Sequence, residues 1–342
     1  MSGAPVSAKQ GGRILEETIL ANRQPIDARA TGMMLLLCGI WGMQQIALKA
    51  VADDMAPMLQ IGLRSGLAAV LIWLFVRLRG ERLAVRRDNW RAGLLAGILF
   101  ALEYLFVGEG LRFTSASHSV VFLYTAPIFA ALGLHWRVAA ERLAPGQWLG
   151  IGLAFAGICI AFFLRPAMAA VGAGAALFGD ALALAGGAAW GATTVVVRCS
   201  RLADTPATAT AFYQLLCAFC VLTLAAWLTG QGHIDWTVGL SASLAYQVLL
   251  VSFFSFLLWF WLLQRYLASR LGAFSFLTPL FGVVLGIGLL DEPLQIGFVI
   301  GAVLVLVGIT LVTTRGHRVP PGGSSVGSKR SATAPTTRGE CQ

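Results

Sequence analysis

Long apolar stretches dominate this 342-residue chain and limit what it can fold into. A helix needs about 20 apolar residues to cross a bilayer. Inside lipid, only helices and closed barrels satisfy every backbone hydrogen-bonding group. Stretches of helical length lie at residues 32–52, 57–79, 91–111, 117–137, 146–165, 177–200, 206–229, 238–263, 270–290 and 295–315. We therefore predict an all-α integral membrane protein with ten transmembrane helices.

The charge content supports lipid as the surrounding solvent. Only 12% of the residues are charged and 57% are hydrophobic, whereas soluble domains carry about 25% charged residues. The net charge of +9 could suggest a nucleic-acid partner. The basic residues, however, are confined to short segments between apolar stretches, which is typical of membrane proteins. We expect no nucleic-acid partner.

Lysine and arginine counts predict the orientation of the chain. If the amino terminus is cytoplasmic, segments on that side hold 21 of the 25 lysines and arginines. Cytoplasmic loops are enriched in these residues, so we expect both termini in the cytoplasm. The first apolar stretch is too long for a signal peptide and should remain uncleaved. It follows a leader at 1–31, and a polar tail at 316–342 is expected to be disordered.

The two halves of the chain repeat one another's motifs. Trp41-Gly42 is followed by a basic residue eight positions after the tryptophan, and so is Trp190-Gly191. We assign the first copy to residues 32–164 and the second to 179–315. Each copy has five apolar stretches, an odd number, so the second must enter the membrane in the opposite direction. Inverted repeats of this kind build many secondary transporters, with the substrate site at the repeat interface.

Polar residues inside the predicted spans are candidates for function because lipid makes them costly. Arg64 and Glu103 each lie eight residues from a span end, about 12 Å deep at 1.5 Å per residue. A charge at that depth costs at least about 3 kcal/mol, so a partner is expected. Three alternatives are open: a structural ion pair, a role in binding protons or an anionic substrate group, and exposure to a water-filled cavity. Lys49 and Gln45 are further candidates, although Gln44 could face the interior instead of Gln45.

Aromatic residues and prolines complete the set of candidates. Aromatic rings with a polar atom could hold the apolar part of a substrate, and those inside the spans are Trp41, Tyr104, Tyr124, Trp190, Tyr213 and Trp259. Pro127 and Pro279 occupy matching positions in the fourth and ninth spans. Each removes a backbone hydrogen bond, which predicts a kink and a hinge candidate. The alternative is a helix that simply starts late.

Motifs for chemistry are missing from the sequence. None of the three lysines, Lys9, Lys49 and Lys329, directly follows a glycine as the G-x-x-x-x-G-K-[ST] spacing requires, so the Walker A motif of ATP-driven proteins is absent. No zinc-protease motif is present, and no serine, histidine and aspartate set has a suitable context. We expect no enzymatic activity, no cofactor and no metal ion.

The order and spacing of these elements resemble the drug/metabolite transporter superfamily, and within it the EamA-type ten-helix permeases. The resemblance covers both halves and rests on Trp41-Gly42 with Lys49, Pro57 with Arg64, the run from Ala116 to Leu143, Gly179-Asp180, Trp190 with Arg198, Pro279 and Asp291-Glu292-Pro293-Leu294. It implies a carrier in the bacterial inner membrane whose central cavity is formed by spans one to four and six to nine. Spans five and ten would lie outside, where they could join the protomers of a homodimer. One departure from symmetry is that Ser255 occupies the position matching Glu103.

These observations favour a secondary transporter that exports a small metabolite by alternating access. An amino acid or a related amphipathic compound is the expected substrate, with protons as a candidate coupling ion and membrane lipid as the surroundings. Arg64 or Lys49 could attract a substrate carboxylate. Two other functions remain open: a non-transporting membrane subunit and a flippase for a lipid-linked substrate.

Overall fold

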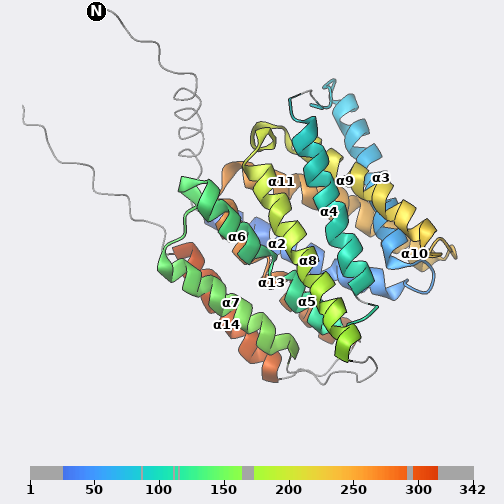
Figure 1. The fold of residues 1–342 in the computed structure, drawn as a ribbon. Coiled ribbons are helices and arrows are strands. Elements are labelled where there is room, and N and C mark those ends of the chain that lie inside the picture. Colours follow the sequence, from blue (N-terminus) through green and yellow to red (C-terminus); the bar gives the residue numbers. More distant parts are fainter. Residues whose placement is uncertain are drawn as a thin grey trace, which may run out of the picture.

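The computed structural model describes residues 26–85, 88–110, 112–114, 116–163, 173–290 and 296–314. Within these ranges almost every residue is helical, and the strand-like pairing found there is a single bridge between Met55 and Ile234. Figure 1 shows the helices packed side by side as one bundle. The motif Asp291-Glu292-Pro293-Leu294, the tail and most of the leader lie outside the described residues.

Ten membrane-crossing segments follow the predicted order. Seven are single helices: α2 (Ala28–Ala50), α3 (Pro57–Leu78), α4 (Trp90–Gly110), α7 (Pro145–Phe163), α8 (Ala173–Arg198), α9 (Ala207–Leu228) and α14 (Ile296–Thr314). Three are composite: α5 (Ala116–Leu123) with α6 (Ala126–Arg137), α10 (Val238–Tyr246) with the π-helix η3 (Gln247–Ser255) and α11 (Phe256–Arg265), and α12 (Ala268–Phe274) with α13 (Leu277–Leu290). Within the described residues, nine segments are long and apolar enough to span a membrane, and α7 is a shorter apolar helix.

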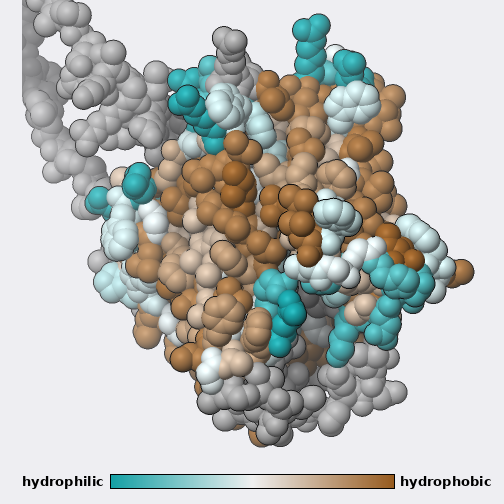
Figure 2. Space-filling model, turned by 45° about the vertical axis from the view of Figure 1, so that its right-hand side comes forward, coloured by the Kyte–Doolittle hydropathy of each residue, from teal (hydrophilic) through white to brown (hydrophobic). Residues whose placement is uncertain are grey.

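The surface of the bundle is hydrophobic, as lipid requires. Leu177 is 71% exposed and Trp227 is 74% exposed. Figure 2 shows one face with a broad hydrophobic area, and hydrophilic residues gather mostly toward its margins. Soluble monomers rarely expose contiguous apolar areas of this kind. The predicted fold class, an all-α integral membrane protein with ten transmembrane helices in two inverted five-helix repeats, is confirmed.

The opposite directions of the two copies are visible at Tyr266. Its hydroxyl donates to the Asp27 carboxylate at 3.2 Å, where α2 begins. Its carbonyl accepts from Arg198 at 3.5 Å, where the corresponding helix α8 ends. We call this side of the bundle the Asp27 end. The other side, where the Thr237 hydroxyl donates to Asp54 at 2.6 Å, is the Asp54 end.

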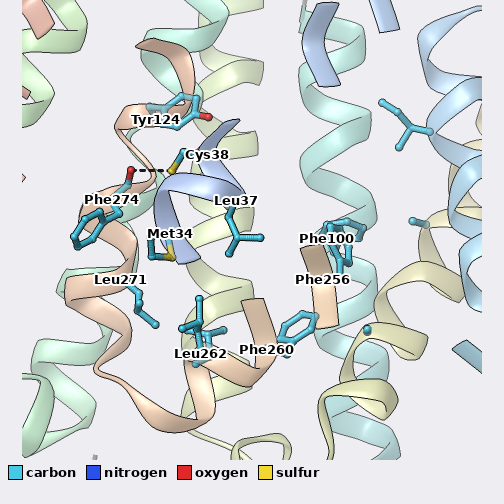
Figure 3. Close-up of a cluster of buried hydrophobic side chains, with 14 of the residues drawn as sticks. Met34, Leu37, Cys38, Phe100, Tyr124, Phe256, Phe260, Leu262, Leu271 and Phe274 are labelled. Atoms are coloured by element: carbon cyan, nitrogen blue, oxygen red, sulfur yellow. Dashed lines mark hydrogen bonds between the residues drawn. The ribbon is translucent and has the colours of Figure 1, made fainter. Parts of the chain in front are cut away.

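Two corresponding segments are broken close to the predicted prolines. Pro127 is the second residue of α6, and Pro279 is the third residue of α13. A proline has no N–H to donate to the residue four positions before it. In the second copy the Phe274 carbonyl, left at the end of α12, accepts from the Cys38 thiol of α2 at 3.3 Å (Figure 3). Both spans are thus interrupted, and the hinge role of the prolines stays a prediction.

Each Trp-Gly motif brings a helix against one of these interrupted spans. A Cβ on Gly191 would lie 2.6 Å from the Phe129 Cβ and 2.9 Å from the Ala126 carbonyl oxygen. A Cβ on Gly42 would lie 2.9 Å from the Gly282 nitrogen. Neither position has room for a side chain, because real Cβ contacts are longer than 3.0 Å. The repeated glycine therefore follows from close helix packing, which small residues permit in membrane proteins.

Gly191→Ala is expected to lower the free energy of unfolding by about 1–3 kcal/mol, the usual cost of overpacking. Gly32→Ala is the matched control, since a Cβ there meets no atom within 4 Å. Alanine favours helix over glycine, so the control should be neutral or stabilising. Thermal unfolding in detergent, followed by size-exclusion chromatography, measures both. Equal melting temperatures for the two variants would contradict the packing argument.

Helices α7 and α14 form a pair along one edge of the bundle (Figure 1). Four glycines let their backbones approach: a Cβ on Gly157 would lie 2.5 Å from the Gly301 carbonyl oxygen, and one on Gly150 would lie 2.6 Å from that of Gly308. Neither helix lines the cavity described below. A role for this pair in joining protomers stays a prediction.

Candidate functional site

A cavity lies between the two copies. It leaves about 110 Å³ for the centres of water-sized molecules, several times the roughly 10–15 Å³ that one water needs. Helices of both copies contribute to its wall, namely α2, α4, α5, α8, α9, α11 and α13. The cavity therefore lies where the inverted repeat predicts a substrate site.

Aromatic side chains form much of the wall, and they pair across the two copies. Trp41 and Trp259 meet edge to face with ring centroids 5.7 Å apart, and Tyr124 and Trp190 do so at 5.6 Å. The Trp41 indole also donates to the Ser255 hydroxyl at 2.9 Å. Edge-to-face pairs add to the stability of buried contacts. Because each pair joins one copy to the other, relative movement of the copies would rearrange the wall.

The polar lining is sparse and partly unsatisfied. It consists of Gln44, Glu103, Thr193, Thr194, Gln214 and Thr278, together with the polar atoms of the aromatic residues. Among the described residues, the Glu103 Oε2 and Gln214 Nε2 atoms are buried without a hydrogen-bond partner. Such atoms are costly in a folded protein and each calls for an explanation, such as a bound water or ligand.

The expected ion pair between Arg64 and Glu103 is not formed. The Arg64 guanidinium donates instead to the Gln247 Oε1 atom at 3.3 Å and to the Tyr104 hydroxyl at 3.2 Å. The predicted depth is correct, since Tyr104 directly follows Glu103. At 3.6 residues per turn, consecutive side chains point about 100° apart, so Arg64 meets one and not the other.

Further polar contacts surround Arg64 on the side of the cavity toward the Asp54 end. The Gln247 Nε2 atom donates to the Gln60 Oε1 atom at 3.1 Å and to the Ser243 hydroxyl at 3.0 Å. Gln60 donates in turn to the Met55 carbonyl at 2.7 Å. This network joins α3 of the first copy to α10 and η3 of the second. It binds the terminal nitrogens of Arg64, while the Nε atom has no hydrogen-bond partner among the described residues.

A buried ion pair joins the two copies at the Asp27 end. The Glu141 Oε1 atom accepts from the Arg198 Nη2 atom at 2.6 Å and from its Nε atom at 2.9 Å, and both side chains are almost fully buried. The same carboxylate accepts from the backbone N–H groups of Ala268 at 2.9 Å and Ser269 at 3.0 Å. These groups begin α12, whose unpaired N–H groups favour a negative charge. We call this arrangement the Glu141–Arg198 lock; it joins the 3-10 turn η1 (Ala139–Glu141) of the first copy to α8 and α12 of the second.

The structure brings together six of the predicted site residues. The cavity is lined by Trp41, Glu103, Tyr104, Tyr124, Trp190 and Trp259. Lys49 is exposed at the Asp54 end, Arg64 lies behind Tyr104, and Tyr213 donates to Asn89 at 3.0 Å away from the cavity. The side chain of Gln45 lies outside the described residues.

Several lining residues were missing from the predicted set, and helical spacing could have found some of them. Thr193 and Thr194 lie three and four residues after Trp190. Gln44, named above as the alternative to Gln45, lies three residues after Trp41 and lines the cavity. Residues at these spacings share a helix face. Gln214 had no comparable signal. Its neighbour Tyr213 also has a polar atom, and the apolar residues around the two do not indicate which of them faces the cavity.

Comparison with known proteins gives consistent matches. The chain matches the EamA-like transporter family over residues 29–163 and 177–314, one match in each copy. The uncharacterized transporter YoaV of Bacillus subtilis is 25% identical over 80% of this chain and 93% of its own length. The uncharacterized inner membrane transporter YedA of Escherichia coli K12 is 25% identical over 77% of this chain and 84% of its own.

An uncharacterized transporter of Archaeoglobus fulgidus is 23% identical over 84% of this chain and 98% of its own length. A solved crystal structure aligns with a TM-score of 0.72 at 19% identity, covering 83% of this chain and 97% of the other. That likeness supports the fold. The family matches extend over both copies of the repeat.

Proposed function

Since this chain belongs to the EamA-like transporter family and is a multi-pass membrane transporter, we propose that it moves a small amphipathic metabolite through the cavity as a secondary transporter. Amino acids and related compounds are the proposed class, and export across the bacterial inner membrane is the proposed direction, with both termini in the cytoplasm. The observation that carries the proposal is the cavity at the seam, because its lining comes from both copies.

Inverted symmetry supplies the physical basis for alternating access. When two similar copies face opposite ways, exchanging their conformations gives a second arrangement of similar energy, open to the other side. The Glu141–Arg198 lock joins the two copies at the Asp27 end, and this contact supports a conformation that is closed on that side. Opening that end requires the lock to separate, and the interrupted spans beside the cavity supply places for the chain to bend. Protons bound at Glu103 are the proposed coupling ion.

Thr194→Trp is expected to reduce transport to the level of protein-free vesicles, because the indole would fill the cavity. Val303→Trp is the matched control, since Val303 is 54% exposed on the outside of α14. Purified protein in proteoliposomes, loaded with a panel of amino acids and related metabolites, is assayed for efflux with and without a pH gradient. Size-exclusion chromatography checks that both variants are folded.

Two results would contradict the proposal. A wild-type protein that moves none of the compounds would favour a non-transporting membrane subunit. Equal efflux from the Thr194→Trp variant would exclude the cavity as the route and favour movement of a lipid-linked substrate along the outside of the bundle.

A further inference from the structure

We infer that the transported compound carries a protonated amine, and that Glu103 and the surrounding aromatic rings bind its ammonium group. The inference rests on the proposed function and narrows its substrate class from amphipathic metabolites in general to cationic amines. It follows from the charges that reach the cavity, from the composition of its wall and from the polar atoms left without partners.

Charge at the cavity is the first argument. Glu103 is the single ionisable acid or base among the described lining residues, apart from tyrosine hydroxyls. Its carboxylate makes no ion pair and its Oε2 atom has no hydrogen-bond partner among the described residues. A buried carboxyl of this kind takes up a proton unless a positive charge beside it stabilises the carboxylate. A cationic ligand group would supply that positive charge.

The basic residues that could offer an alternative, Arg64 and Arg198, are not among the described lining residues. The Arg64 guanidinium donates to Gln247 and Tyr104, and its central carbon lies 5.5 Å from the Tyr104 ring centroid. Arg198 is bound in the Glu141–Arg198 lock. The predicted attraction of a substrate carboxylate by Arg64 or Lys49 therefore has no support in the lining. An anionic substrate group would instead be repelled by the Glu103 carboxylate.

The wall of the cavity suits an organic cation. Tryptophan and tyrosine faces attract ammonium groups through their ring quadrupoles, and several such rings around one site form the aromatic cages that bind them. Trp41, Trp190 and Trp259 line the cavity with Tyr104 and Tyr124. The cross-copy ring pairs hold four of these side chains in place, so the cage needs little ordering when a ligand binds.

Binding of a matched ligand series tests the inference. The probes are 2-phenylethylamine, its neutral analogue 2-phenylethanol and its anionic analogue phenylacetate, titrated calorimetrically into the full-length protein in detergent at pH 7. Hydrogen bonds to charged groups are the stronger class, so the amine should bind about tenfold to hundredfold more tightly than the alcohol. Phenylacetate should bind most weakly of the three.

Variants at Glu103 and a matched acid separate charge recognition from folding. Glu103→Gln should bring the amine to the affinity of the alcohol, and Glu103→Asp should keep the order of the three probes. Glu109→Gln makes the same chemical change nearer the end of α4, where Glu109 pairs with Arg112 at 2.8 Å. That control should keep the wild-type affinities.

The outcomes distinguish this inference from the proposed function. If the alcohol or phenylacetate binds as tightly as the amine, or if Glu103→Gln keeps the preference, the inference is wrong and transport through the cavity still stands. If no probe binds and no compound of any charge is transported, the proposed function itself fails. A preference for amines that Glu103→Gln removes supports the inference.

Discussion

Arg198→Ala is expected to lower the free energy of unfolding by about 3–5 kcal/mol, the usual cost of leaving a buried charge unpaired. The side chains of Arg198 and Glu141 are 2% and 0% exposed, so water cannot replace the lost partner. The Arg198 Nη1 atom also donates to the Leu263 carbonyl at 3.0 Å, and that contact is lost too. Thermal and denaturant unfolding in detergent measures the effect.

Arg201→Ala is the matched control for this experiment. Arg201 pairs with Asp88 at 3.1 Å, but the two side chains are 72% and 52% exposed. Exposed ion pairs contribute about 0–1 kcal/mol, so this variant should unfold almost as the wild type does. The double variant Glu141→Ala with Arg198→Ala should lose less than the sum of the single variants. Equal losses for Arg198→Ala and Arg201→Ala would show that the lock does not stabilise the fold.

Glu103→Gln is expected to abolish transport without destabilising the protein. The carboxylate is buried and without a hydrogen-bond partner at its Oε2 atom among the described residues. Removing its charge therefore removes a desolvation cost and breaks no hydrogen bond that the structure shows. Transport should be lost because the cavity no longer offers a negative charge to a cation or a proton.

The measurement pairs efflux from proteoliposomes with thermal unfolding of the same preparation. Glu109→Gln again serves as the control and should leave both readouts at the wild-type level. A Glu103→Gln protein that transports normally would remove Glu103 from the mechanism. A variant that unfolds at a much lower temperature would instead assign Glu103 a structural role.

The prediction of the helices was accurate because the length of an apolar stretch is a local property. The first span begins at Ala28 rather than at residue 32, since the Asp27 side chain accepts from the Ala30 N–H at 2.7 Å and caps the helix earlier. Single capping contacts of this kind set a boundary without altering the apolar pattern. The proline positions also indicated the interrupted spans, because the missing N–H is a property of the residue itself.

The prediction of the site was less complete because it depends on how each helix is rotated. Trp41 and Trp190 were found through the repeated motif. The ion pair between Arg64 and Glu103, one of three alternatives, is not formed. Depth along a helix can be counted from the sequence, but the direction of a side chain around the axis depends on the neighbouring helices. A rotation of about 100° separates Glu103 from Tyr104, and the packing of α3 and α4 against α9 selected Tyr104 as the partner.

The amino-acid sequence by itself determined that this protein lies in lipid, that ten helices cross it and that two five-helix copies run in opposite directions. These properties follow from the length of the apolar stretches and from the odd number of spans in each copy. Neither depends on contacts between distant residues. Only the tertiary structure decided that Glu141 meets Arg198, 57 residues away, and that Arg64 meets Gln247, 183 residues away. Such contacts depend on the packing of whole helices. Glu103 could therefore be identified as the acid that faces the cavity only after the partners of Arg64 and Arg198 were known.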